Sequence, residues 1–237
     1  MALSSRPCQN NVLMSSNAIL PEPTDPAEAI ARQTLAKRGA QYANEVRRLL
    51  DAGLDAMRKC GTTSSPRVAD IVAAAGLSND AFYRHFASKE ALVAAIIEDG
   101  AARLASYLHH QMAKARTPEG RVRRWVEGVM SQAADDDIAA TTRAVLWNGG
   151  RISDSLGSNR PSHAESLAVL LREPFAQLGS TAAETDAALA AHTVVGMLSD
   201  LLRRGVRPTQ AEIDHIAEFC LAAVTSRRVS RSTKERH

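Results

Sequence analysis

Residues 67–90, RVADIVAAAGLSNDAFYRHFASKE, decide how this 237-residue chain folds. An apolar face at helical spacing predicts a first short helix, with Val68, Ile71, Val72 and Ala75 on that face. Gly76 predicts its end, because glycine accepts the left-handed backbone of a helix C-terminus. Ser78 or Asn79 can cap a second helix, and Ser88 can cap a third that begins at Lys89. Two helices joined by a short turn that contains glycine indicate a helix-turn-helix, whose second helix lies in the DNA major groove.

Residues 45–97 resemble the N-terminal domain of TetR-family transcriptional regulators. The matching positions are Ile71, Ala75, Gly76, Leu77, Ser78, Phe82, Tyr83, His85, Phe86, Ser88, Lys89, Glu90 and Leu92. A helix-turn-helix alone is a weak signal, whereas its Tyr-x-His-Phe-x-Ser-Lys-Glu continuation is specific. The rest of the chain fits the family only in length and helical character. The resemblance implies an all-α protein, with a three-helix head joined by a long helix to a larger ligand-binding and dimerisation domain.

Composition supports the same fold class and excludes several functions. Hydrophobic residues make up 45% of the chain, alanine is abundant, and we find no alternating Val/Ile/Thr runs of the kind that strands need. The net charge of +3 is mild, but eight Lys or Arg against three acids lie between Arg32 and Arg67. No phosphate loop, metal-ligand spacing or nucleophile motif is present, so we expect no enzyme, cofactor or metal.

The three cysteines have no paired spacing, and no signal core or membrane-spanning stretch is visible. We therefore expect a cytoplasmic, nucleoid-associated protein with no membrane partner.

Four segments are predicted. Residues 1–40 form a largely disordered extension in which a helix from about Ala27 is interrupted at Gly39. Its basic residues either follow the DNA minor groove or belong to a solvated leader. Residues 41–90 form the helix-turn-helix domain, with the motif at about 66–86. A regulatory and dimerisation domain spans 91–227, with a turn expected at 148–150 and a loop at 153–162, and a basic tail occupies 228–237.

Exposed polar residues in and around the motif are the candidate DNA contacts. They are Ser65, Arg67, Ser78, Asn79, Asp80, Tyr83, Arg84 and Lys89. Arg84 is the candidate for base readout, since arginine pairs with guanine in a bidentate way. The resemblance implies that Tyr83 and Lys89 bind phosphates. Asp80 either accepts from a cytosine amine or favours the helix dipole, and His85 is expected to be packed in the core.

The last two helices, about 182–204 and 209–227, are apolar over wide arcs and joined by a short turn. We expect them to form a two-fold dimer through a four-helix bundle, as the resemblance also implies. The predicted interface residues are Val195, Leu198, Leu202, Ile213, Ile216 and Cys220. The alternative is an ordinary hairpin within one chain.

Apolar residues outside those stripes are the candidate ligand pocket. They are Leu104, Leu108, Met112, Trp125, Met130, Trp147, Leu170, Leu171 and Phe175, and the alternative for each is ordinary core packing. These features predict a sequence-specific regulator, a repressor, that binds a palindromic DNA operator as a homodimer and is released by an unknown, mainly apolar small molecule. The alternative is a constitutive architectural or adaptor DNA-binding protein without an effector.

Overall fold

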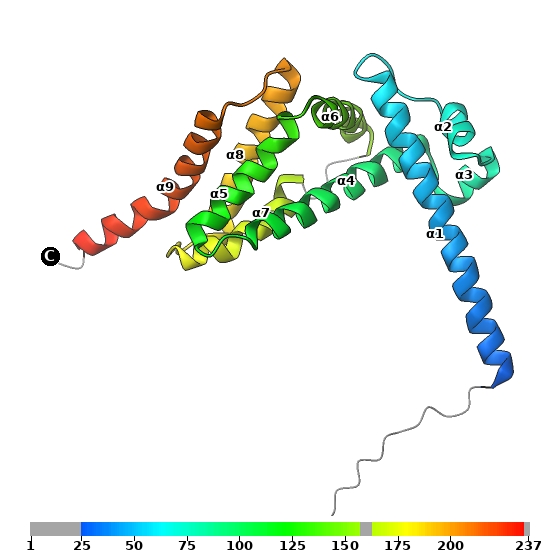
Figure 1. Cartoon of the computed structure of the whole chain (residues 1–237), viewed down its shortest axis with the longest axis horizontal. Coiled ribbons are helices and arrows are strands. Elements are labelled where there is room, and N and C mark those ends of the chain that lie inside the picture. Colours follow the sequence, from blue (N-terminus) through cyan, green and yellow to red (C-terminus); the bar gives the residue numbers. More distant parts are fainter. Residues whose placement is uncertain (1–24, 157–162, 235–237) are drawn as a thin grey trace, which may run out of the picture. The chain divides into compact units, whose positions relative to one another are not determined.

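The computed structural model describes residues 25–156 and 163–234, and the regular structure in these ranges is entirely helical (Figure 1). The helices are α1 (Pro26–Cys60), α2 (Val68–Ala75), α3 (Asn79–His85), α4 (Lys89–Met112), α5 (Pro118–Met130), the 3₁₀ turn η1 (Ser131–Ala133), α6 (Asp136–Leu156), α7 (His163–Gln177), α8 (Ala183–Arg204) and α9 (Gln210–Lys234). The prediction of an all-α protein is confirmed.

Backbone contacts divide the chain into a first unit that ends at Ala43 and a second that begins at Asn44. Helix α1 runs through this boundary without a break at Gly39, so the predicted interruption there is wrong. A glycine inside a helix costs only about 1 kcal/mol, which the surrounding helix-forming residues offset. The disorder expected before residue 25 concerns residues outside the described ranges.

The head predicted from the sequence consists of residues 44–60 of α1, helices α2 and α3, and the first two turns of α4. Its core is built from the apolar faces of these helices. The fully buried side chains are Leu49, Met57, Ile71, Phe82 and Leu92. Helix α3 buries Ala81, Phe82 and the side chain of His85, whereas Asn79, Asp80, Tyr83 and Arg84 are exposed. The short helices α2 and α3 therefore depend on this common core, because helices of eight and seven residues are unstable in isolation.

The turn between α2 and α3 has the chemistry that its sequence predicts. Gly76 adopts the left-handed conformation at φ 61°, and the N–H of Leu77 bonds to the carbonyl of Val72 at 2.9 Å. Arg48 of α1 donates to the Gly76 carbonyl at 3.1 Å, which ties the turn to the head. The Ser78 hydroxyl caps α3 by accepting from the N–H of Ala81 at 3.1 Å, which confirms a predicted cap.

We expect Gly76→Ala to lower the free energy of unfolding by about 1–2 kcal/mol. Residue 76 has a left-handed backbone conformation, which an alanine rarely adopts. The added Cβ would also lie only 2.8 Å from the Arg48 guanidinium. Denaturant unfolding measures the loss. Gly39→Ala is the matched control, because Gly39 lies in an exposed helix with no atom near an added Cβ, and it should leave stability equal or slightly higher. Equal stability of both variants would contradict the turn geometry.

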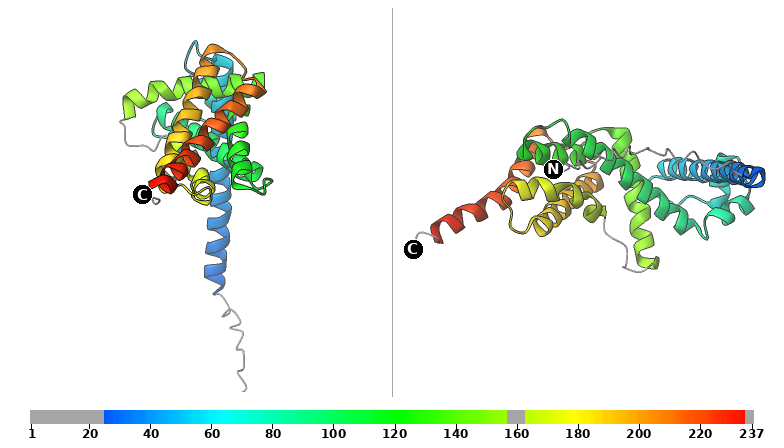
Figure 2. Two further views of the ribbon diagram at one scale, coloured as in Figure 1. Left: turned by 90° about the vertical axis from the view of Figure 1, so that its left-hand side faces the viewer. Right: turned by 90° about the horizontal axis from the view of Figure 1, so that it is seen from below.

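A second core lies in the helices that follow. Helix α4 leaves the head and packs on α5, and α7 lies along α8 while α9 packs against α5 (Figure 1). We call the buried residues of these helices the regulatory core; its largest fully buried members are Trp125, Phe175, Leu108, Met130 and Leu171. Figure 2 shows α4 and α6 lying between the head helices and the remaining helices of the second unit.

Helix α6 includes residues that were predicted to form a turn and a loop. Residues 148–150, predicted as a turn, are helical within Asp136–Leu156, as is the part of the predicted 153–162 loop before residue 157. The rest of that loop lies outside the described residues. Glycine at 149 has a packing role, since an added Cβ would lie 2.9 Å from Cδ1 of Ile97 on α4. Glycine here permits close approach of two helices, and sequence alone does not distinguish that from a turn.

Candidate nucleic-acid interface

The outward face of α3 presents the residues predicted to contact DNA. Asn79, Asp80, Tyr83 and Arg84 are exposed, with Tyr83 at 59%, whereas Phe82 behind them is fully buried. Ser78 is exposed too, and although its oxygen accepts the cap bond, its own O–H remains able to donate. The helix therefore offers hydroxyl, amide, phenol and guanidinium groups on one face, the donor types that bind base edges and phosphates.

Arg84 lies close to a carboxylate of α1. Its Nη1 lies 3.7 Å from Oε2 of Glu45, and the same oxygen lies 2.8 Å from Nε2 of His85. The His85 side chain is fully buried, so it is packed as predicted, while the Arg84 side chain stays 60% exposed. Glu45 therefore orients Arg84 without removing it from solvent.

Arg67 and Asp80 flank this face. Arg67 forms a two-pronged ion pair with Asp70 at 2.9 and 3.2 Å, and this hydrogen-bonded partner raises the pKa of the guanidinium. The pair is largely exposed, so a phosphate could replace Asp70 at little cost. Asp80 lies in the first turn of α3, where a carboxylate favours the helix dipole. This position is compatible with both roles considered for Asp80.

Lys89 and Ser65 come together at the start of α4, and a third residue joins them. Lys89 Nζ donates to the Ser65 hydroxyl at 3.1 Å, and Ser65 Oγ lies 3.4 Å from Oδ1 of Asn148 on α6. Asn148 is only 3% exposed and donates its amide to the Ala144 carbonyl at 2.8 Å. The role of Asn148 was not predicted from the sequence, because its neighbouring glycines suggested a turn and nothing local indicates a partner 83 positions earlier.

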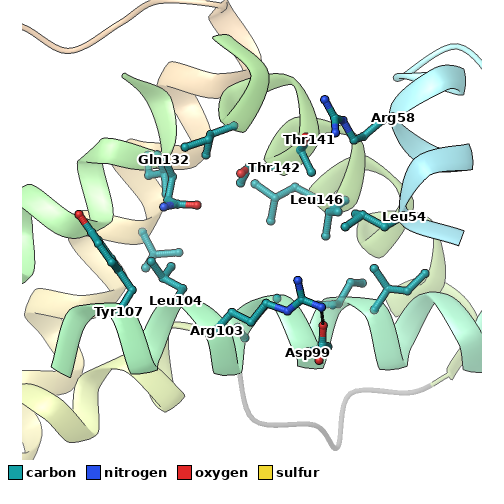
Figure 3. Close-up of a pocket in the computed structure, with 18 of the residues that line it drawn as sticks. Leu54, Arg58, Asp99, Arg103, Leu104, Tyr107, Gln132, Thr141, Thr142 and Leu146 are labelled. Atoms are coloured by element: carbon teal, nitrogen blue, oxygen red, sulfur yellow. Dashed lines mark ion pairs between the residues drawn. The ribbon is translucent and has the colours of Figure 1, made fainter. Parts of the chain in front are cut away.

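A cavity of about 540 Å³ opens between α1, α4 and α6 (Figure 3). Its apolar lining includes Leu50, Leu54, Ile96, Ile97, Leu104, Val145 and Leu146. Charged residues in its lining are paired: Arg103 binds Asp99 at 2.7 Å, and Arg58 lies 3.9 Å from Asp137. Gln132, Thr141 and Thr142 add uncharged polar groups. Such a lining suits a mainly apolar, uncharged molecule, because an ionised ligand would have to displace existing ion pairs.

Of the residues predicted to form a ligand pocket, Leu104 lines this cavity, and the others do not. Leu108, Met112, Trp125, Met130, Leu171 and Phe175 are buried in the regulatory core, and Trp147 is half-buried on α6. The indole N–H of Trp125 donates to the Leu167 carbonyl at 3.2 Å, as expected for a satisfied core tryptophan. Their apolar character could not separate core from pocket, since both kinds of residue have the same helical spacing.

Most residues of the predicted dimer interface are also buried within their own chain. Leu198, Leu202, Ile213, Ile216 and Cys220 are buried in the regulatory core, and Val195 and Leu198 reach the cavity. Burial raises the pKa of the Cys220 thiol to about 11, so it stays neutral at physiological pH. The outer faces of α8 and α9 instead expose other apolar side chains, which are Leu189 (59%), Met197 (42%) and Phe219 (60%).

Two further observations concern the described ranges only. No group of His, Cys, Asp or Glu side chains there is arranged to hold a metal ion. None of the helices in residues 25–156 and 163–234 combines the length and apolar character that a bilayer crossing requires.

Comparisons with known proteins agree with this geometry. Residues 49–96 match the family model of bacterial regulatory proteins, tetR family. No curated protein matches the chain at a significant level. Among solved structures, a protein described as a TetR-family transcriptional regulator from Mesorhizobium loti has a TM-score of 0.56 at 18% identity, covering 78% of this chain and 96% of its own. The fatty acid degradation regulator FadR from Bacillus halodurans has a TM-score of 0.52 at 19% identity, covering 75% and 94%.

The matched segment coincides with the head, and the solved structures share the fold of the chain well beyond it. Residues 49–96 therefore carry the DNA-binding domain that is typical of bacterial regulatory proteins of the tetR family.

Proposed function

We propose that the protein is a repressor that binds a palindromic operator as a homodimer and releases it when a small, mainly apolar effector binds. The observation that supports operator recognition is the outward polar face of α3, held by the fully buried Phe82. On this proposal Arg84 reads a base, and Tyr83, Lys89, Arg67 and Ser78 bind backbone phosphates. Ser65, predicted as a further contact, takes part through its hydrogen bond with Lys89.

Selection of bound duplexes from random DNA tests the proposal directly. A two-fold site should emerge, because a symmetric dimer presents two copies of α3 to two half-sites one helical turn apart. Its affinity should exceed that for unrelated DNA by roughly 10³-fold or more. Binding without sequence preference would favour the architectural or adaptor alternative.

The proposed division between base and phosphate contacts predicts two different mutant phenotypes. Arg84→Ala should cost about 1–3 kcal/mol and relax preference at one base position in each half-site. Lys89→Ala should weaken all sequences alike and reduce the salt dependence of binding. Affinities measured on a panel of single-base operator variants at several salt concentrations separate the two. Identical behaviour of both variants on every sequence would refute the assigned roles.

The dimer is proposed to form through the outer faces of α8 and α9, where Leu189, Met197 and Phe219 are exposed. Large apolar side chains that stay exposed on adjacent helices are typical of a surface that a partner covers. Phe219→Asp should raise the dimer dissociation constant by about 10- to 100-fold, since it places a charge in an apolar interface. Val169→Asp on α7, at an exposed apolar position elsewhere, is the control. Sedimentation equilibrium measures both, and equal dimerisation would place the interface elsewhere.

The effector is proposed to occupy the cavity between α1, α4 and α6. Its volume lies in the range of small-molecule sites, and its walls come from both the head and the regulatory helices. A ligand that prefers one arrangement of these walls would change operator affinity by its differential binding energy, about 1–3 kcal/mol. Operator affinity measured with a library of uncharged apolar molecules tests this. No change with any member would leave a constitutive DNA-binding protein.

A further inference from the structure

We propose that Asn148 of α6 is a positioning residue for DNA binding, which holds Ser65 and Lys89 at the edge of the head through a directed chain of hydrogen bonds. The inference rests on the proposed function for its operator measurement, and it adds a residue from the regulatory helices to the DNA-binding surface.

The direction of the chain follows from its donors and acceptors. Lysine can only donate, so the Ser65 oxygen accepts from Lys89 Nζ at 3.1 Å. The single Ser65 proton is then available to Oδ1 of Asn148 at 3.4 Å. The Asn148 amide cannot be reversed, because its nitrogen lies 2.8 Å from the Ala144 carbonyl, which can only accept. Each group in the chain therefore has one role.

The position of Asn148 is set by close packing of α6 on the head. Ala144, one turn earlier, is 1% exposed and belongs to the core cluster of the head. Gly149, the next residue, allows Ile97 of α4 to pack closely against α6, since an added Cβ at this position would lie only 2.9 Å from Cδ1 of Ile97. Asn148 is itself buried, so its carbonyl oxygen is held where Ser65 can reach it. Helix α6 thereby fixes one end of the hydrogen-bond chain from Asn148 through Ser65 to Lys89.

The consequence for DNA binding lies in Lys89. Its ammonium has three donors, and the Ser65 bond uses one, which leaves two for phosphate oxygens. A lysine held in this way loses less side-chain entropy when it binds DNA than a freely rotating one. The same α6 contributes Thr141, Thr142 and Val145 to the cavity wall, so the proposed effector would contact the helix that is linked to Lys89 through Ser65.

A double-mutant cycle tests the chain. Asn148→Leu, which is close in volume, should lower operator affinity about 2- to 10-fold, the range of one ordinary hydrogen bond. That loss should largely disappear in a Lys89→Ala background, because Asn148 acts through Lys89. Ser65→Ala should behave like Asn148→Leu, and Ser65→Thr should restore affinity because it keeps the hydroxyl. Ser131→Ala, which removes a side-chain bond to the Gly128 carbonyl outside the head, is the control that should change nothing. Additive losses from Asn148→Leu and Lys89→Ala would overturn the proposal.

A measurement without DNA separates this proposal from the proposed function. NMR relaxation of the Lys89 side chain in the free protein should show greater mobility in Asn148→Leu and in Ser65→Ala than in the wild type. Unchanged mobility in both variants would overturn the chain even if operator binding is sequence-specific. Increased mobility in a protein that selects no DNA site would support the chain and refute the operator proposal instead. If Asn148→Leu fails to fold, Ser65→Ala and Ser65→Thr carry both measurements.

Discussion

Phe82→Ala is expected to lower the stability of the head by about 3–5 kcal/mol and to abolish specific DNA binding. The Phe82 side chain is fully buried, and its ring packs against Phe86 at a centroid distance of 6.0 Å and against Tyr83 at 5.2 Å. Because it is the largest anchor of a seven-residue helix, the cavity left by alanine cannot be filled by a small local shift. Helix α3 would then lose the position that presents its polar face.

The effect should stay within the head, since the regulatory core is a separate cluster of buried residues. Hydrogen exchange followed by mass spectrometry should therefore show faster exchange in α2 and α3 and little change in α5 and α8. Tyr83→Ala is the matched control, because Tyr83 is the exposed neighbour on the same helix. It should weaken DNA binding while leaving stability within about 0.5 kcal/mol of wild type. Uniform loss of protection across the chain would show that the two cores unfold as one unit.

Trp125→Ala should destabilise the protein by about 3–5 kcal/mol through the regulatory core. The indole is fully buried, and its N–H is satisfied by the Leu167 carbonyl on α7. Truncation would remove the largest side chain of that core and its hydrogen bond to the Leu167 carbonyl. Trp125→Phe, which keeps most of the volume, should lose only about 0.5–1.5 kcal/mol, the net contribution of one hydrogen bond, because the Leu167 carbonyl keeps its bond within α7.

Denaturant unfolding measures both Trp125 variants, and Trp147→Phe serves as the control at the only other tryptophan, a half-buried position. The outcome also decides between two interpretations of Trp125. A stable Trp125→Ala protein that loses only effector response would support the sequence-based assignment to a ligand pocket. A large stability loss supports the core position that the structure assigns.

The head was predictable because its signals are local. Gly76, Ser78 and Ser88 set helix ends through their own backbone preferences and side-chain oxygens, and each acts within four residues. The periodic apolar residues then leave only one face of α3 exposed. The predicted helices at about 182–204 and 209–227 agree with α8 and with most of α9, which continues to Lys234, since helical spacing and a glycine at 205 are visible without any tertiary information.

The predictions of helix breaks at glycines were wrong, because a glycine can end a helix, lie inside one or permit close packing, and the sequence alone does not distinguish these cases. Gly39 lies inside an uninterrupted helix, and Gly149 allows α6 to approach Ile97, although both resemble breaks in the sequence. The prediction of a dimer interface from apolar stripes had a similar weakness. Leu202 and Ile216 have the spacing of an interface, yet they are buried within their own chain, while Phe219 remains exposed.

By itself, the sequence determined that this chain is helical, that residues 67–90 turn two short helices against each other, and which side of α3 is left exposed. These properties depend on backbone preferences and periodicity over a few residues. Only the tertiary structure decided which apolar residues form core, cavity or outer surface, and that Asn148 reaches Ser65 and Lys89. Those relations join residues dozens of positions apart, and their distances depend on how whole helices pack, which no local pattern specifies.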